Sequence, residues 1–196
     1  MGTDVQGTLP GVGNPRKTTT VRGYEIDEVK SALQKAIRRD QQEAAMFWAK
    51  EMAESDLSKA LWRRLRVIAA EDCAGIDAVT FVSNCAHAAG QCRDHLLFGM
   101  RAALELARCE KDRTVDDYLT WFDHKLTALG DRSVLYSIPD EALGEHTRRG
   151  RTMGRSHATF YHVGSKLENE GAFYDKQYIR FLKAQFPLEQ DDPPCD

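Results

Sequence analysis

EIDEVKSALQKAIRRD, residues 25–40, is the stretch that decides the fold, because its apolar side chains recur at three- and four-residue steps. Such spacing is typical of one face of an α-helix. The residues on this face are Ile26, Val29, Leu33, Ala36 and Ile37. Two further segments, QQEAAMFWAKEMAE (residues 41–54) and LSKALWRRLRVIAAEDC (residues 57–73), carry similar patterns. The sequence therefore predicts three consecutive amphipathic helices.

Helical signals continue through the rest of the chain. The pattern predicts further helices over residues 76–89, 93–108, 114–129, 139–146, 156–166 and 174–185. Gly75, Gly90 and Gly130 mark expected helix ends, because glycine enters the left-handed cap conformation without a side-chain penalty. No segment alternates apolar and polar residues as a half-buried strand does. The expected fold class is all-α, a multi-helix bundle.

The composition is that of an ordinary globular protein, with 196 residues, 29% charged and 42% hydrophobic. A net charge of −3 predicts no overall attraction to nucleic acid or acidic membranes, so local basic clusters must carry any such interaction. The five cysteines are an odd number without a CxxC spacing, which favours reduced thiols and a cytoplasmic location. No apolar run approaches the ~18 residues of a membrane span.

The two ends of the chain differ from the middle. Residues 1–22 and 188–196 are rich in glycine, proline or acidic residues and poor in apolar anchors, so we expect flexible tails there. A single helical domain is expected over residues 23–187.

The segment from residue 40 to residue 72 resembles the C-terminal region of the RarA/MgsA-type AAA+ ATPases, which are related to clamp loaders. The resemblance rests on AAMFWA (residues 44–49), LWRRL (residues 61–65) and VIAAED (residues 67–72). A second segment, residues 138–167, resembles the late part of short stand-alone relatives of that region. The resemblance implies a bundle similar to the clamp-loader collar, the tetramerisation domain of those ATPases.

The resemblance also implies a function. It favours a non-enzymatic oligomerisation or interaction module that works near DNA replication, recombination or repair, with a protein of that machinery as partner and DNA as a further candidate. An ATPase activity is not implied, because the sequence contains no matching catalytic domain. Exposed apolar area on the first three helices is expected to drive self-association. A phage or mobile-element protein that mimics the host collar is another interpretation.

Three patterns resemble known sites but fit a structural role better. GVGNPRKT, residues 11–18, has Arg16 where a phosphate-binding loop needs its second glycine. Glu71 and Asp72 lie in a helical context, which favours structural carboxylates over a Mg²⁺ site. Two cysteines and two histidines have the wrong spacing for a zinc finger, namely Cys85, His87, Cys92 and His95. No cofactor or metal is therefore expected.

HTRRGRTMGRSH, residues 146–157, is the strongest anion-binding candidate, because arginine forks bind phosphate and glycine lets a backbone approach an anion. It gives the alternative function, an anion- or nucleotide-phosphate-binding protein. The candidate residues are Arg148, Arg149, Arg151 and Arg155, with His146 and His157 as proton carriers. The pattern fits somewhat better a solvated basic corner that pairs with Glu141, Glu145 or a neighbouring subunit.

Arg63 and Arg64 form a second basic candidate, with Arg38, Arg39 and Arg66 nearby in the pattern. Such a face is typical of contacts to a nucleic-acid backbone. A solvated helix surface or a subunit contact explains it as well.

Overall fold

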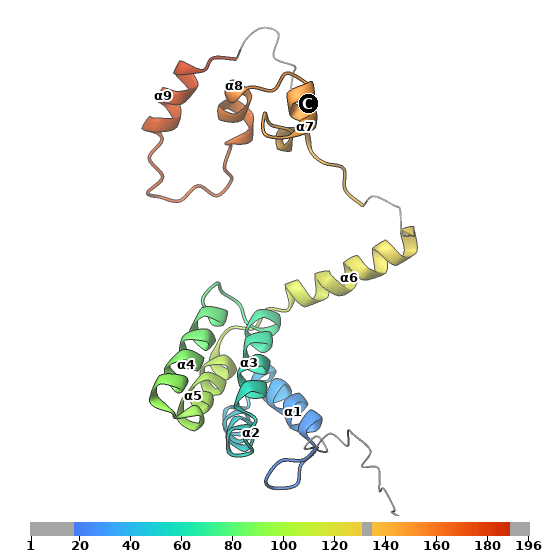
Figure 1. The fold of residues 1–196 in the computed structure, drawn as a ribbon, viewed down its shortest axis with the longest axis vertical. Coiled ribbons are helices and arrows are strands. Elements are labelled where there is room, and N and C mark those ends of the chain that lie inside the picture. The colour runs from blue at the N-terminus through green and yellow to red at the C-terminus, as the bar shows by residue number, and fades with distance from the viewer. Residues whose placement is uncertain (1–17, 131–134, 189–196) are drawn as a thin grey trace, which may run out of the picture. The chain divides into compact units, whose positions relative to one another are not determined.

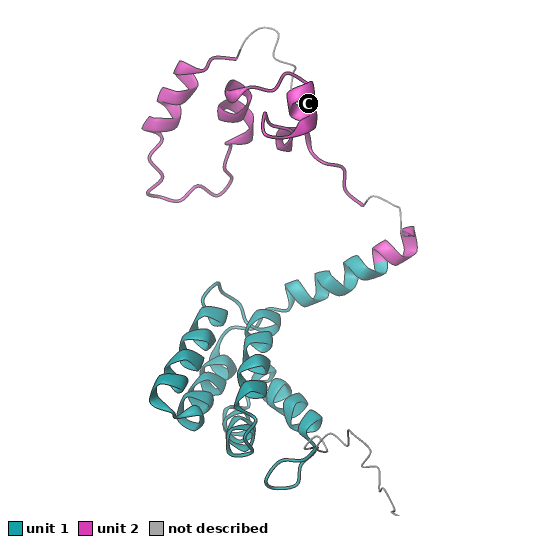
Figure 2. Cartoon of the chain, in the orientation of Figure 1, with its two compact units in different colours: residues 1–124 teal, residues 125–196 magenta. Residues whose placement is uncertain are grey.

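The computed structural model describes residues 18–130 and 135–188, and over these residues the protein is all-α with no strand, as predicted. The chain divides into two compact units, residues 1–124 (unit 1) and residues 125–196 (unit 2), as Figure 2 shows. The single domain expected over residues 23–187 spans parts of both units. Most of the two expected tails, residues 1–17 and 189–196, lies outside the described residues.

Unit 1 is a helical bundle (Figure 1). Its first five helices are α1 (Ile26–Arg38), α2 (Gln42–Glu54), α3 (Ser58–Asp72), α4 (Ala78–Cys92) and α5 (His95–Arg108). Helix α2 packs along α5, α1 packs against α2, and α4 packs against both α3 and α5. The apolar faces predicted for the first three segments form the core. Its fully buried side chains include Leu33, Ile37, Leu61, Leu65 and Ile68.

Small residues let these helices approach closely. Ala45 and Ala49 of α2 are fully buried, and so are Ala102 and Ala103 of α5. Gly99 of α5 faces α3, where a Cβ atom would lie 2.8 Å from the Leu61 Cδ2 atom. The absence of a side chain at this glycine therefore makes room for a leucine of the neighbouring helix.

The turn between α4 and α5 falls later than expected. Gly90 lies inside α4, and the helix ends at Cys92. Arg93 then adopts a left-handed conformation with φ 56°, and the Asp94 carboxylate accepts a hydrogen bond from the Leu97 backbone N–H at 2.9 Å. The side-chain cap, rather than the glycine, sets the boundary, because it satisfies a backbone donor that the start of α5 would leave unpaired.

Residues 18–22, expected to belong to a flexible tail, are folded against α2. The Val21 N–H donates to the Ser55 hydroxyl at 3.0 Å, and the Arg22 N–H donates to Glu51 Oε1 at 3.2 Å. Burial raises the pKa of the Glu51 carboxyl, but hydrogen bonds from Thr20 and Arg22 outweigh burial and hold the pKa below its usual 4.5. The folded unit thus begins several residues before α1.

Helix α6 (Thr114–Leu129) matches its predicted range and crosses the boundary between the units, but it buries no side chain. Unit 2 contains only short helical elements: η1 (Asp140–Ala142), α7 (Arg148–Thr152), α8 (His157–Thr159), η2 (Phe160–Gly164) and α9 (Gln177–Gln185). The helix predicted over residues 139–146 is reduced to one 3₁₀ turn. The helix predicted over residues 156–166 is a short α-helix followed by a π-helical turn.

Candidate functional site

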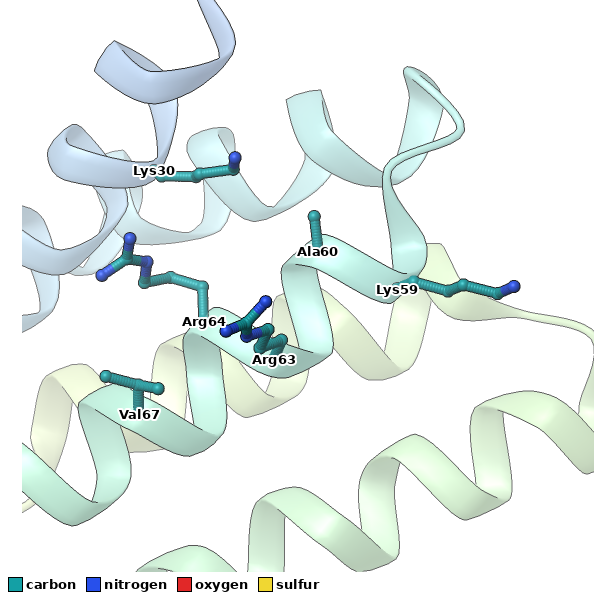
Figure 3. Close-up of a pocket in the computed structure, with 6 residues that line it drawn as sticks. All are labelled: Lys30, Lys59, Ala60, Arg63, Arg64 and Val67. Atoms are coloured by element: carbon teal, nitrogen blue, oxygen red, sulfur yellow. The ribbon is translucent and has the colours of Figure 1, made fainter. Parts of the chain in front are cut away.

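A basic pocket of about 520 Å³ opens on unit 1 between α1 and α3 (Figure 3). Its lining residues are Lys30 from α1 and Lys59, Ala60, Arg63, Arg64 and Val67 from α3. In Figure 3 the Lys30 side chain extends from α1 toward the space above α3, while Lys59 extends away from the other cations. Four of the six lining residues are therefore cationic, and we call this feature the basic pocket.

The core determines which side chains of α3 reach the basic pocket. Leu61, Leu65 and Ile68 are fully buried, so the rotation of α3 about its axis is fixed. Residues one position away from this buried stripe then lie at its edge. Arg64 lies at that edge and is half-buried, whereas Arg63 is two residues from both Leu61 and Leu65, so it lies on the outer face of α3 and is exposed. The amphipathic pattern of α3 thus places both sequence-predicted arginines at the pocket.

A buried carboxylate holds α1 and α3 together beside the pocket. Asp72 is fully buried and accepts hydrogen bonds from Arg38 Nε at 2.8 Å, Arg113 Nη1 at 2.9 Å and Gln34 Nε2 at 3.0 Å. Burial raises the pKa of Asp72, yet the hydrogen bonds from Arg38, Gln34 and Arg113 outweigh burial and lower it. Glu71 accepts from the same two arginines. The predicted structural role of both carboxylates is confirmed.

Gln34 links this ion-pair network to the basic pocket. Its side-chain amide donates to Asp72 and, through Oε1, accepts from Arg64 Nη1 at 3.3 Å. Arg38 points into the network and pairs with Asp72, so it does not extend the basic surface that the sequence suggested. The guanidinium of Arg64 is thus oriented by a contact that leaves its charge without a carboxylate.

The cations of the basic pocket are not neutralised by the rest of the described chain. Within residues 18–130 and 135–188, no carboxylate oxygen lies within 4.0 Å of a charged nitrogen of Lys30, Lys59, Arg63 or Arg64. In the same range, other lysines and arginines form thirteen ion pairs. Positive charge therefore concentrates at this pocket although the chain as a whole carries a net charge of −3.

The arginines of residues 146–157 do not converge on one site. Arg155 is buried and pairs with Asp140 of η1. Arg151 Nη1 donates to the backbone carbonyl oxygens of Glu145 and His146 at 3.3 and 3.0 Å. These two guanidinium groups hold unit 2 together. Arg148, Arg149 and Arg151 are all exposed on α7, but the guanidinium of Arg151 is already engaged by backbone carbonyl oxygens.

The histidines of this loop meet a carboxylate instead of an open anion site. Glu145 lies 3.3 Å from His146 Nε2 and 2.7 Å from His157 Nδ1. The glycine expected to admit an anion is filled by the chain itself, since a Cβ atom at Gly150 would lie 2.0 Å from the backbone oxygen of Gly144. The loop therefore packs against its own backbone at Gly150. Its histidines contact Glu145, as expected if the loop is a basic corner that pairs with nearby carboxylates.

The cysteines and histidines considered as a zinc site lie in different surroundings. His95 Nδ1 receives a hydrogen bond from the Trp62 indole N–H at 3.1 Å, and Cys85 is buried in α4 while His87 is exposed. Among the described residues, no three His, Cys, Asp or Glu side chains are grouped so as to hold a metal ion. In the same part of the chain, no helix has the length and apolar character needed to cross a bilayer.

Helix α6 presents the most continuous apolar stripe that remains exposed. The stripe is defined by Val115, Leu119, Phe122, Leu126 and Leu129, which follow one another at steps of four, three, four and three residues. Phe122 is half-buried and contacts the rings of Tyr118 and Trp121, and the other four side chains are exposed. Leu119 is 61% exposed and Val115 is 71% exposed. By contrast, the apolar faces of the first three helices, expected to drive association, are mostly buried in unit 1, and Phe47 of α2 is an exception that stays exposed. Helix α6 therefore carries a helical apolar stripe that is largely exposed.

No family model matches the chain, and no curated protein matches it significantly in sequence. The likeness to the RarA/MgsA C-terminal region thus stays a prediction from the quoted segments.

Sequence reasoning found Arg63 and Arg64 but missed the two lysines of the basic pocket. The four-residue step between Lys59 and Arg63 is visible in the sequence and indicates a shared helix face. Nothing in the sequence brings Lys30 to them, because that requires the packing of α1 on α3.

Proposed function

We propose that the protein is a helical interaction module that self-associates through the apolar stripe of α6. One observation carries the proposal: α6 is a regular helix of 16 residues that buries none of its side chains. Most helices in proteins gain their stability from the packing of an apolar face rather than from helix propensity alone. A partner for the stripe supplies that packing.

The spacing of the stripe favours another helix as the partner. Steps of four and three residues are the heptad pattern in which side chains of one helix fit between those of a second helix. Leu119 and Leu126 occupy equivalent positions one heptad apart, and Thr120 and Thr127 lie beside them on the outer face. A second copy of the chain presents the same stripe, and symmetric pairing of identical surfaces is the commonest form of oligomer.

The resemblance to the RarA/MgsA C-terminal region supports the same proposal and gives it a setting. That region is an oligomerisation domain, so we propose a protein partner in replication, recombination or repair, and a cytoplasmic location. No enzymatic role is proposed. The alternative, a phosphate site in residues 146–157, has less support because Arg151 and Arg155 already serve internal contacts.

The experiment is a mass measurement by sedimentation and light scattering over a wide range of concentration. We expect a dimer or larger species for the wild type. The variant Leu119→Lys/Leu126→Lys should be monomeric, because it places charges in the seam. The matched control Thr120→Lys/Thr127→Lys adds the same charges to the outer face of the same helix and should keep the wild-type mass.

A wild-type protein that stays monomeric at high concentration would sink the proposal. Equal behaviour of the two lysine variants would also contradict it, since the apolar stripe would then have no special role.

A further inference from the structure

We infer that the basic pocket between α1 and α3 binds adjacent phosphate groups, such as those of a single-stranded nucleic acid, without reading the bases. This inference concerns unit 1 alone and does not depend on self-association through α6. It starts from an imbalance of charge. Four cations line one pocket, and none of them is paired with a carboxylate of the described chain.

The chemistry of the lining fits phosphate. Two guanidinium groups offer forked donors that match phosphate oxygens, and two lysines offer compact point charges. No acidic side chain belongs to the lining, so an oxyanion meets no repulsion from the pocket walls. A divalent cation is the least suitable occupant, because its oxygen ligands are missing from the lining.

Preorganisation strengthens the site. Arg64 donates to Gln34, and Gln34 is held in turn by the buried carboxylate of Asp72. A guanidinium that is already positioned loses less side-chain freedom when it binds an anion. The neutral amide leaves the positive charge of Arg64 available to a ligand.

The spacing of the cations favours several phosphates over one. Lys59 and Arg63 are one helical turn apart, about 5–6 Å between Cβ atoms. Lys30 approaches from the other helix, as Figure 3 shows. The charged ends are more widely spread than the Cβ atoms, because Lys59 extends away from the other cations, so several phosphates can meet them more easily than one. A flexible single strand can bend its backbone into a pocket of about 520 Å³, whereas a stiff duplex can only lie across its opening, so we commit to a single strand.

The lining also explains why no base is expected to be recognised. Its two uncharged residues are Ala60 and Val67, and it contains no aromatic ring on which a base can stack. Contacts to phosphate fix position on a nucleic acid but carry no sequence information. Binding should therefore depend strongly on salt and little on base composition.

The experiment measures binding of fluorescein-labelled oligothymidylate to the full chain by fluorescence anisotropy at several salt concentrations. If each of the four cations meets one phosphate, the slope of log K against log salt is about −2.8 for a single strand. The variant Lys59→Gln/Arg63→Gln removes two contacts, which lowers affinity about 25-fold at ~0.1 M salt. Both side chains are exposed and make no ion pair with the described chain, so the variant should fold normally, which circular dichroism checks.

The matched control is Arg148→Gln/Arg149→Gln, which removes the same charge from the exposed arginines of α7. It should bind oligothymidylate as the wild type does. Equal weakening by both variants would show attraction to diffuse charge and would overturn the inference. The same conclusion follows if the wild type binds neither oligothymidylate nor tripolyphosphate at low salt, or if only the α7 variant loses binding.

Tripolyphosphate, used as a competitor and in a thermal-shift assay, separates the two sources of phosphate. If it stabilises the wild type but not Lys59→Gln/Arg63→Gln, while oligothymidylate does not bind, the single strand is rejected and a free polyphosphate takes its place. If oligothymidylate binds, oligoadenylate should bind with similar affinity. A large preference for one base would contradict a site built only for phosphate.

Discussion

Replacing Asp72 by alanine should lower the free energy of unfolding of unit 1 by about 3 kcal/mol. The carboxylate is fully buried and accepts hydrogen bonds from Arg38, Arg113 and Gln34. Removing one partner of a buried ion pair costs about 3–5 kcal/mol, because a charge is left without compensation. We expect a cost at the lower end of this range for Asp72→Ala. Both arginines keep Glu71 as a partner, and their side chains are 28% and 32% exposed, so water screens them.

The assay is urea unfolding followed by far-ultraviolet circular dichroism, with the midpoint and slope compared between variants. Asp77→Ala is the matched control, because Asp77 is exposed and its side chain makes no capping hydrogen bond. It should change stability by less than about 0.5 kcal/mol. A loss below about 1 kcal/mol for Asp72→Ala would refute the view that this network holds α1 to α3.

The pH dependence follows from the same residue. The pKa of Asp72 is lower in the folded protein than its usual 3.8, so the unfolded chain binds the proton more readily. The stability that Asp72 contributes is therefore fully present at neutral pH and is lost as the pH falls through and below the usual carboxyl range of about 4. The difference between wild type and Asp72→Ala should shrink in that acidic range. A difference that grows on acidification would show that the sign of the shift is wrong.

Two further predictions address other parts of the chain. Gly150→Ala should destabilise unit 2 by about 3 kcal/mol, because its Cβ atom meets a backbone oxygen. Gly144→Ala, whose Cβ atom has nothing within 4 Å, should leave limited proteolysis of residues 135–188 unchanged, and equal proteolysis of both variants would contradict this reasoning. Burial raises the pKa of Cys73 to about 12, so iodoacetamide at mildly alkaline pH should modify exposed Cys92 and spare Cys73 until urea is added. Peptide mass mapping measures both sites, and early labelling of Cys73 would argue against its burial.

The helices of unit 1 could be predicted because their signal is local. The steps between Leu61, Leu65 and Ile68 encode a buried face whatever lies opposite it. The exact turn between α4 and α5 was missed, because Gly90 permits a break but does not require one. The cap made by Asp94 decided the boundary instead.

The site was only partly predictable, because its geometry depends on residues far apart in the sequence. Arg63 and Arg64 were identified from the helix that carries them. Arg155 resembled them in the sequence, yet it is buried against Asp140, fifteen residues away. Whether an arginine is free or paired is decided by tertiary packing, and a one-dimensional pattern does not contain that information.

The side-chain amide of Gln34 has one orientation open to it. An ionised carboxylate can only accept hydrogen bonds, so Nε2 must turn toward Asp72 and Oε1 is left for Arg64. A buried carboxylate of the bundle thereby fixes the orientation of Arg64 at the surface. A substitution that weakens the hydrogen bond between Gln34 and Asp72 should therefore give the Arg64 guanidinium more freedom to move. The stability of the interior and the affinity of the basic pocket for an anion are thus thermodynamically linked.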